Sequence, residues 1–113
     1  MLNSKYRFHS RGGVRYTYQK GKTIRTPILS LVYNHNDHGF QRFAVVVSKK
    51  VEKSAVGRNR IRRRIYEAIR LELPEYKTKN DNIFVVYSKS LMTLPFEEIR
   101  KEVRSLLEQS LHA

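Results

Sequence analysis

The segment that most restricts the fold covers residues 58–73, RNRIRRRIYEAIRLEL, and lies between two stretches of strand-like composition. Its apolar residues recur at the three- and four-residue spacing of a helix and fall on one narrow arc of the helix surface: Ile61, Ile65, Ala68, Ile69 and Leu73. Pro74 disfavours α geometry at the residue before it, so we expect the helix to end there. A long helix between two strands predicts a β-α-β crossover with parallel strands.

The rest of the chain divides into further strands and helices. Residues 27–33, 42–50 and 82–89 are rich in β-branched and apolar residues, which favours strands, and 23–26 favours a short edge strand. Helical features mark two more segments. The first is 12–20, with Ser10 as a cap and Gly21 past its end, and the second is 95–111, with Pro95 in its first turn.

The predicted fold is therefore an α+β, two-layer α/β sandwich in the order α-β-β-β-α-β-α, with the helices on one face of the sheet. We expect one domain over residues 1–113, with 1–11 loosely ordered because this segment is polar and basic. A crossover of this kind is right-handed by default.

The charge of the chain restricts its partners. It has 23 Lys+Arg and 10 Asp+Glu, a formal net charge of +13 at pH 7 and an isoelectric point near 10.3. Such an excess favours an anionic partner, and nucleic acid is the leading class. An anionic membrane surface is less favoured, because no long basic amphipathic helix carries Trp, Phe or Leu on its apolar face.

Features that the sequence lacks indicate the cellular compartment of the protein. There is no cysteine, which excludes disulfides and thiolate metal sites. The first residues lack the apolar stretch of a secretory signal, and no apolar run has the length of a membrane span. We therefore expect a cytoplasmic protein.

The arginines of the central helix follow a pattern around its surface. Opposite the apolar arc fall Asn59, Arg63, Tyr66 and Arg70, while Arg62 and Arg64 flank the arc from either side. A guanidinium group grips two phosphate oxygens at once, which suits a nucleic acid backbone. A merely solvated face would carry mixed charges, since like charges at this spacing repel. Upstream, where a strand leaves the sheet, Lys49, Lys50 and Lys53 extend the basic patch.

Aromatic residues offer a second kind of contact. Val14 and Tyr18 share a face of the first predicted helix, and with Tyr33, Phe40 and Phe43 they would form a platform for unpaired bases. Ordinary core packing is the favoured role for most of these aromatics.

The sequence shows no convincing catalytic or metal centre. For His35 and His38, with Asp37 between them, a solvated turn is favoured over a metal site because further ligands are missing nearby. No nucleophile–base pair or paired carboxylates are evident, so we assign no catalytic residue and no bound cofactor to the polypeptide.

Residues 48–70, SKKVEKSAVGRNRIRRRIYEAIR, resemble the RNR signature of the bacterial ribonuclease P protein subunit. The segments YQKGKTI, RFAVVVSKK and LPFEEIRKEVRSLL are similar to flanking parts of that family. The resemblance implies a protein that assists a catalytic RNA in removing the 5′ leader of precursor tRNA. It implies that the RNR region faces the catalytic RNA and that a cleft between the first helix and the sheet holds the leader. It further implies that Mg²⁺ serves the RNA, and that the β-α-β crossover is left-handed.

Residue by residue, the RNR motif falls on Arg58, Asn59 and Arg60, and the following basic pair on Arg62 and Arg63. The family's next basic position is Tyr66 here, so Arg64 or Arg70 is expected to replace that contact. Asn59 either hydrogen-bonds RNA or caps the local backbone. The two aromatic positions of the leader cleft fall on Val14 and Tyr18, the first of which is aliphatic in this chain.

Three other classes remain open at this point. A ribosomal or generic RNA-binding protein shares the charge but gives no dependence on the leader. A protein-only nuclease would cleave without RNA, and a DNA-binding protein would be competed by duplex DNA.

Overall fold

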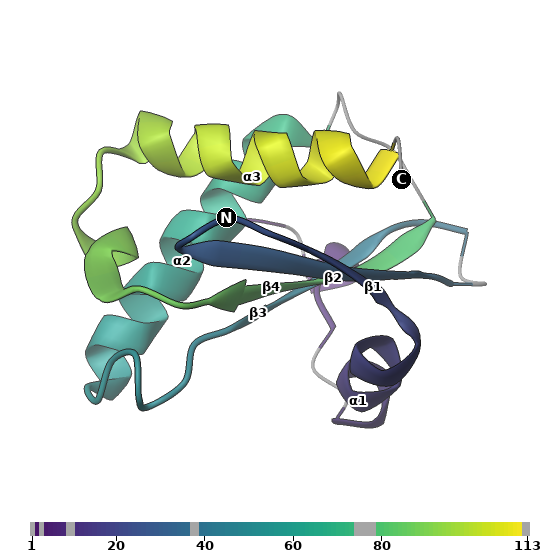
Figure 1. The fold of residues 1–113 in the computed structure, drawn as a ribbon, viewed down its shortest axis with the longest axis horizontal. Coiled ribbons are helices and arrows are strands. Elements are labelled where there is room, and N and C mark those ends of the chain that lie inside the picture. Colours follow the sequence, from purple (N-terminus) through teal and green to yellow (C-terminus); the bar gives the residue numbers. More distant parts are fainter. Residues whose placement is uncertain (1, 3, 9–10, 37–38, 74–78, 112–113) are drawn as a thin grey trace.

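The computed structural model describes residues 2, 4–8, 11–36, 39–73 and 79–111 (Figure 1). Its elements follow the chain as η1 (Ser4–Tyr6), α1 (Arg11–Lys20), β1 (Lys22–Arg25), β2 (Leu29–His35), β3 (Arg42–Val46), α2 (Ala55–Glu72), β4 (Asn80–Val86), η2 (Lys89–Met92) and α3 (Phe96–Leu111), where η marks a 3-10 helix. The predicted α+β class and element order are confirmed, with two short 3-10 helices added.

The four strands form one sheet in the order β1-β2-β4-β3. β2 is antiparallel to both β1 and β4, and β3 is parallel to β4. Since α2 connects β3 to β4, the predicted crossover between neighbouring parallel strands is confirmed. Its handedness stays a prediction.

The central helix begins earlier than the sequence indicated. The Ser54 side chain accepts a hydrogen bond from the Gly57 N–H at 3.2 Å, so Ser54 is the N-cap and α2 starts at Ala55. The helix ends at Glu72, close to the predicted boundary. The residues predicted to stop this helix and to cap the first one, Pro74 and Ser10, lie outside the described residues.

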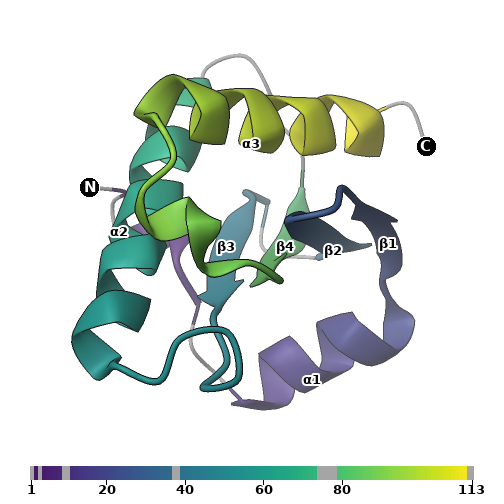
Figure 2. The ribbon, with the colours of Figure 1, turned by 60° about the vertical axis from the view of Figure 1, so that its left-hand side comes forward.

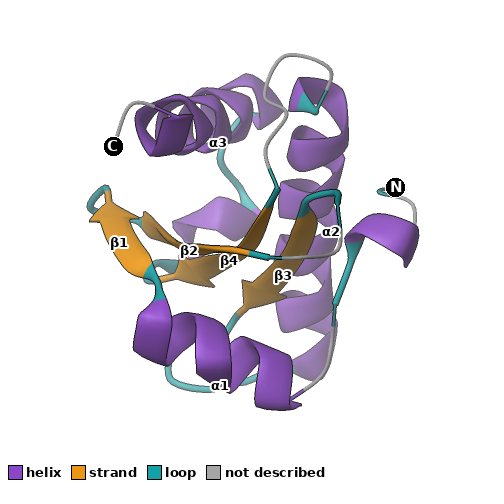
Figure 3. Cartoon of the chain, turned by 90° about the vertical axis from the view of Figure 1, so that its right-hand side faces the viewer, coloured by secondary structure: helices purple, strands orange, loops and turns teal. Residues whose placement is uncertain are grey.

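The two faces of the sheet are covered differently. Side chains alternate along a strand: Leu31 of β2 packs in the large core under α2 and α3, and its neighbour Val32 belongs to a small cluster with Val14 of α1. Figures 1 and 3 show α1 on one side of the sheet and α3 on the other. The expectation that all helices share one face is therefore right for α2 and α3 and wrong for α1.

Gly21 allows α1 to lie close to the sheet. A Cβ at this position would be 2.5 Å from the carbonyl oxygen of Thr17 and 2.8 Å from that of Tyr33, distances that real Cβ atoms do not reach. Only glycine fits this approach without a shift of backbone. The close turn fixes α1 over the face of the sheet opposite the large core.

The N-terminal segment, expected to be loosely ordered, lies along the free edge of β3 over its described residues. The Phe8 N–H donates to the Phe43 carbonyl oxygen at 3.0 Å, and Arg7 pairs with Phe43 as an isolated parallel bridge. Leu2 and Phe8 are buried. This segment covers an edge that would otherwise expose unpaired backbone groups, and it brings Arg7 close to α2.

Candidate nucleic-acid interface

A groove of about 330 Å³ lies where the N-terminal segment, α1, β3 and α2 meet. We call it the basic groove; its lining is Arg7, Phe8, Val14, Ala44, Val45, Val46, Asn59, Arg62, Arg63 and Tyr66. Figure 2 shows α2 and α1 on either side of the sheet edge formed by β3. Three guanidinium groups line the groove, and none of its described lining residues is acidic. Its floor is apolar and one wall is cationic, which suits a nucleic acid strand.

One flank of α2 faces this groove. We call it the groove flank; it comprises Asn59, Arg62, Arg63 and Tyr66. Arg62 Nη1 donates to Asn59 Oδ1 at 2.8 Å, which holds the guanidinium beside the groove. Arg63 is exposed, and no side-chain hydrogen bond or ion pair joins it to another residue of the described ranges. Because Ser54 caps the helix, the Asn59 side chain orients Arg62 instead of capping the backbone.

The opposite side of the helix, which we call the η2 flank, consists of Arg60 and Arg64. Arg64 Nη1 donates to the Leu91 carbonyl oxygen at 2.8 Å, and its Nη2 donates to that of Leu94. Arg60 Nε donates to the Met92 carbonyl oxygen at 3.2 Å. Burial, with the charge of Arg60, lowers the pKa of Arg64. These arginines attach α2 to the segment that follows β4.

At the start of α2, Arg58 closes the preceding turn. Its Nη1 donates to the carbonyl oxygens of Glu52 at 3.0 Å and Lys53 at 2.8 Å. Gly57 permits this turn to pack closely, because a Cβ there would lie 2.7 Å from Glu52 Cγ. Three cations predicted to bind RNA are consequently presented on the surface beside the helix: Lys49, Lys50 and Lys53.

Arg70, another residue predicted to bind RNA, forms an ion pair with Glu67 one turn earlier on α2. This pairing raises the pKa of Arg70. The neighbouring carboxylate offsets part of its charge, so Arg70 is the weakest candidate of the predicted arginines.

Tyr66 differs from its expected position. The helical wheel placed it on the outer surface, whereas it is only 5% exposed. Burial raises the pKa of Tyr66, and the Val45 backbone and the nearby guanidinium groups of Arg7 and Arg62 offset only part of this effect. The side chain is covered because the edge of β3 and the N-terminal segment lie against this flank, which a helical wheel does not represent. Tyr66 thus forms part of the groove wall.

Helix α1 contributes the other predicted cleft residues. Val14 packs against Val32, Ala44 and Ile83 and lines the basic groove. Tyr18, one turn further on, is 43% exposed, and burial followed by the nearby Tyr87 raises its pKa. The two predicted residues therefore lie at different points along the same face.

Tyr87, which the sequence analysis missed, is 42% exposed beside Tyr18. Its hydroxyl lies 3.0 Å from Ser30 Oγ, and the Arg25 guanidinium carbon lies 4.6 Å from its ring centroid. The two-residue alternation from Ile83 through Val85 would have placed Tyr87 on the α1 face. Tyr18 and Tyr87 form an exposed aromatic pair at the far end of that face.

Core packing, the role favoured for most of the aromatic residues, is confirmed for two members of the alternative platform. Tyr33 and Phe43 are buried in the large core, on the face covered by α2 and α3. Phe40 is half-buried and meets Tyr6 edge-on at 6.1 Å between ring centroids. The period of a strand decides which aromatic residues reach a surface, and these belong to the opposite set from Tyr87.

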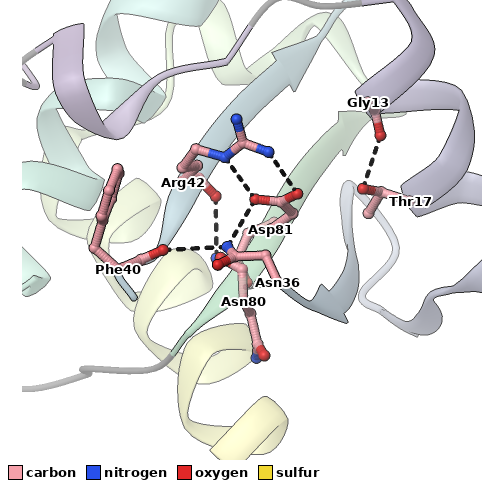
Figure 4. A network of polar contacts seen from close by, with 8 residues as sticks. Gly13, Thr17, Asn36, Phe40, Arg42, Asn80 and Asp81 are labelled. Carbon is pink, nitrogen blue, oxygen red and sulfur yellow. Dashed lines mark hydrogen bonds and ion pairs between the residues drawn. The ribbon is translucent and has the colours of Figure 1, made fainter. Parts of the chain in front are cut away.

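A polar network closes one end of the sheet on the α1 side (Figure 4). Arg42 Nε and Nη2 each donate to a carboxylate oxygen of Asp81 at 2.8 Å, and Asn36 Nδ2 donates to Asp81 Oδ1 at 2.9 Å. The hydrogen bond with Asp81 raises the pKa of Arg42. The Arg42 guanidinium carbon lies 4.9 Å from the Phe8 ring centroid. This cation is neutralised within the chain, so it adds little to the charge of the basic groove.

Within the described ranges, no group of three or more His, Cys, Asp or Glu residues is arranged to hold a metal ion. The predicted turn residues Asp37 and His38 lie outside those ranges. No helix among the described residues has both the length and the apolar character needed to span a membrane.

Together these features define an α+β protein with a basic groove at one edge of its sheet. None of the described residues that line this groove is acidic. The chain belongs to the Ribonuclease P family, whose model matches residues 2–110. It is 38% identical over 90 residues to the ribonuclease P protein component of a Thermoanaerobacter species, covering 80% of this chain and 76% of that relative. It is 33% identical over 105 residues to the ribonuclease P protein component of Chloroflexus aurantiacus, covering 93% and 77%.

The fold agrees with this assignment. The ribonuclease P protein from Thermotoga maritima superposes with a TM-score of 0.82 over 91% of this chain and 96% of that chain, at 20% sequence identity. The predicted resemblance to the bacterial ribonuclease P protein subunit is confirmed by the family model and by both relatives.

Proposed function

We propose that this chain, as the protein component of ribonuclease P, holds the 5′ leader of precursor tRNA beside the catalytic RNA of that enzyme. Ribonuclease P is a ribonucleoprotein endoribonuclease, and the family of this chain supplies its protein subunit. The partner of the protein is therefore the ribonuclease P RNA. The leader as a ligand, and the residues that touch it, are what we propose here.

The observation that carries the proposal is the basic groove. Arg62 and Arg63 on one wall face Val14 across an apolar floor, and no described lining residue is acidic. Guanidinium groups bind phosphate oxygens in pairs, and an apolar floor accommodates bases or riboses. A single strand enters such a groove more readily than a duplex, whose bases are already stacked and paired.

The α1 face continues from the groove toward Tyr18 and Tyr87. Both rings are partly exposed, and base–aromatic stacking contributes about 1–3 kcal/mol per base. We place the leader along this face, with phosphates near Arg62 and Arg63 and a base against the tyrosine pair. The valine at position 14 offers apolar contact without stacking, which makes the tyrosines the main aromatic contacts.

The outer cations of α2 and of the turn before it face the catalytic RNA in this arrangement. These are Lys49, Lys50, Lys53, Arg58, Arg60 and Arg70, several of which also hold the chain together. The RNA carries the cleavage chemistry and the Mg²⁺ ions that serve it, and the protein supplies position and charge. If five phosphates are neutralised, log K falls with log salt with a slope of roughly −3.5 to −4.5.

Reconstitution tests the proposal. The protein is added to a bacterial ribonuclease P RNA at low Mg²⁺, and leader removal from precursor tRNA is measured. We expect stimulation of cleavage, and tighter binding of precursor than of mature tRNA once protein and RNA are combined. Equal affinity for the two tRNAs would refute leader binding, and a lack of stimulation with several bacterial RNAs would refute the role as a whole.

A further inference from the structure

We propose that Arg7, held over the ring of Tyr66, forms an RNA phosphate site in the basic groove and replaces the basic side chain absent from position 66. This inference rests on the function proposed above and assigns one anionic subsite to named residues. The ligand is a backbone phosphate of RNA, from either the leader or the catalytic RNA.

The first observation is the place of Arg7 in the groove. Arg7 lines the same space as Arg62 and Arg63, without a described carboxylate in the lining. Three like charges in one groove repel each other in the free protein. An anion placed among them relieves that repulsion, so the arrangement favours binding of a phosphate.

The second observation is an unpaired donor. Arg7 Nε is buried and has no hydrogen-bond partner among the described residues. A buried N–H without a partner is costly, and most such groups in proteins are paired. A phosphate oxygen is the acceptor that a guanidinium binds best, through Nε and one Nη together.

The third observation is how the cation is held. The Arg7 guanidinium carbon lies 5.9 Å from the Tyr66 ring centroid, within the range of a cation–π contact. The ring is itself held by packing, because Tyr66 is only 5% exposed and belongs to the large core together with Val45. The Phe8 N–H bond to Phe43 fixes the backbone next to Arg7. The site is therefore arranged before RNA arrives, which lowers the entropic cost of binding.

The two residues of the subsite come from different parts of the chain. Tyr66 belongs to α2, where the family resemblance expects a basic residue, and Arg7 belongs to the N-terminal segment. The charge missing from the helix is thus returned to the groove by a residue more than fifty positions earlier. This arrangement differs from the expectation that Arg64 or Arg70 compensates, since Arg64 binds carbonyl oxygens and Arg70 pairs with Glu67.

The first test compares Arg7→Gln with Lys5→Gln, which removes the same charge two residues earlier from an exposed side chain outside the groove. Affinity is measured in two arms: protein for catalytic RNA alone, and the reconstituted enzyme for precursor against leaderless tRNA. We expect Arg7→Gln to weaken the affinity about tenfold in one of the two arms, the size of one charge-assisted contact. Lys5→Gln should weaken it by less than about twofold. The arm that responds identifies which RNA supplies the phosphate.

The second test changes the ring. Tyr66→Leu removes the aromatic surface that holds Arg7, and Tyr66→Phe keeps that surface while losing only the hydroxyl group. We expect Tyr66→Leu to weaken the same arm as Arg7→Gln, and Tyr66→Phe to bind like the parent protein. Urea unfolding of each variant separates lost affinity from lost folding.

The outcomes are separable from those of the proposed function. If the parent protein stimulates leader removal but Arg7→Gln and Lys5→Gln agree within twofold in both arms, the Arg7 site is refuted and the function stands. If Arg7→Lys, which keeps the charge but not the flat guanidinium, recovers only part of the affinity, the stacked geometry is supported. Full recovery by lysine would refute the need for the Tyr66 ring.

Discussion

The two flanks of α2 carry the same residue type for different purposes. On the η2 flank, the guanidinium of Arg64 donates to the carbonyl oxygens of Leu91 and Leu94, and that of Arg60 donates to the carbonyl oxygen of Met92. On the groove flank, Arg62 contacts only Asn59 in the described hydrogen-bond network, and Arg63 is exposed. A row of arginines in a sequence therefore overstates the charge available to RNA. What separates the two groups is which neighbouring segment each side of the helix meets.

The largest expected effect is on the groove flank. Replacing Arg62 and Arg63 together by glutamine removes the two charge-assisted phosphate contacts proposed for this flank. We expect about 3 kcal/mol of binding free energy to be lost, roughly a hundredfold in affinity for precursor tRNA in the reconstituted enzyme. Filter binding at fixed salt measures this loss.

The matched control removes two exposed cations elsewhere, Lys22→Gln with Lys101→Gln. This control lowers the net charge by the same amount, and we expect it to weaken the affinity for precursor tRNA by less than about tenfold. The free energy of unfolding of the groove variant should stay within about 0.5 kcal/mol of the parent, as for surface substitutions. Similar affinity losses in the two double variants would show that net charge alone binds the RNA and would break the distinction between flanks.

The second largest effect belongs to the η2 flank and falls on stability. Arg64→Gln removes donors to two carbonyl oxygens in a partly buried place, and we expect unfolding to become easier by about 2 kcal/mol. Urea denaturation measures this change. RNA affinity, measured where the variant is folded, should change by less than threefold. A large loss of affinity with unchanged stability would place Arg64 among the RNA contacts.

These flanks also show how far sequence reasoning reaches. The apolar period of α2 located Ile61, Ile65 and Ile69, and all three are fully buried. The same wheel misplaced Tyr66 because the surface of a helix is decided by what packs against it, and here that is a segment distant in sequence. Arg7 was absent from the candidates for this reason, since its role depends on pairing with β3.

The α1 side of the sheet gives a similar lesson. Val14 and Tyr18 were placed on one face by helical period, and the structure confirms that α1 presents a face to the sheet. Their assignment to leader binding stays a prediction. Tyr87 was missed although strand alternation indicated its face, because alternation alone does not show that this end of the face is open. Periodicity identifies which side chains share a face, and tertiary packing decides whether that face is open.

A third prediction concerns the end of α2, where Glu72 is only 3% exposed and accepts hydrogen bonds from Arg100 and Arg104 of α3. The hydrogen bond from Arg104, followed by that from Arg100, lowers the pKa of Glu72 below its usual value of 4.5. A lowered folded-state pKa contributes stability that is fully present above the unfolded value. This contribution is lost as the pH falls through the folded-state value.

We therefore expect the melting temperature to fall as the pH is lowered from about 5 toward 3, below the ordinary glutamate pKa. The control is Glu72→Gln, which should start from lower stability at pH 7 and lose less over the same interval. If the melting temperatures of the two proteins fell by the same amount over this pH interval, a role of this carboxylate would be contradicted. Since Glu72 links α2 to α3, the result extends the structural function of the helix beyond the η2 flank.

The smallest effect is expected at Arg70, which lies past the groove on the outer surface of α2. Its ion pair with Glu67 is exposed, and surface pairs of this kind contribute little to stability because water and salt screen them. Arg70→Gln should leave the urea midpoint of unfolding nearly unchanged and weaken RNA binding by less than about threefold. Glu67→Gln sharpens this prediction, because it frees the Arg70 guanidinium. If Glu67→Gln strengthens RNA binding and Arg70→Gln abolishes that gain, Arg70 is a contact restrained by its own neighbour, and the groove flank extends one turn further along the helix.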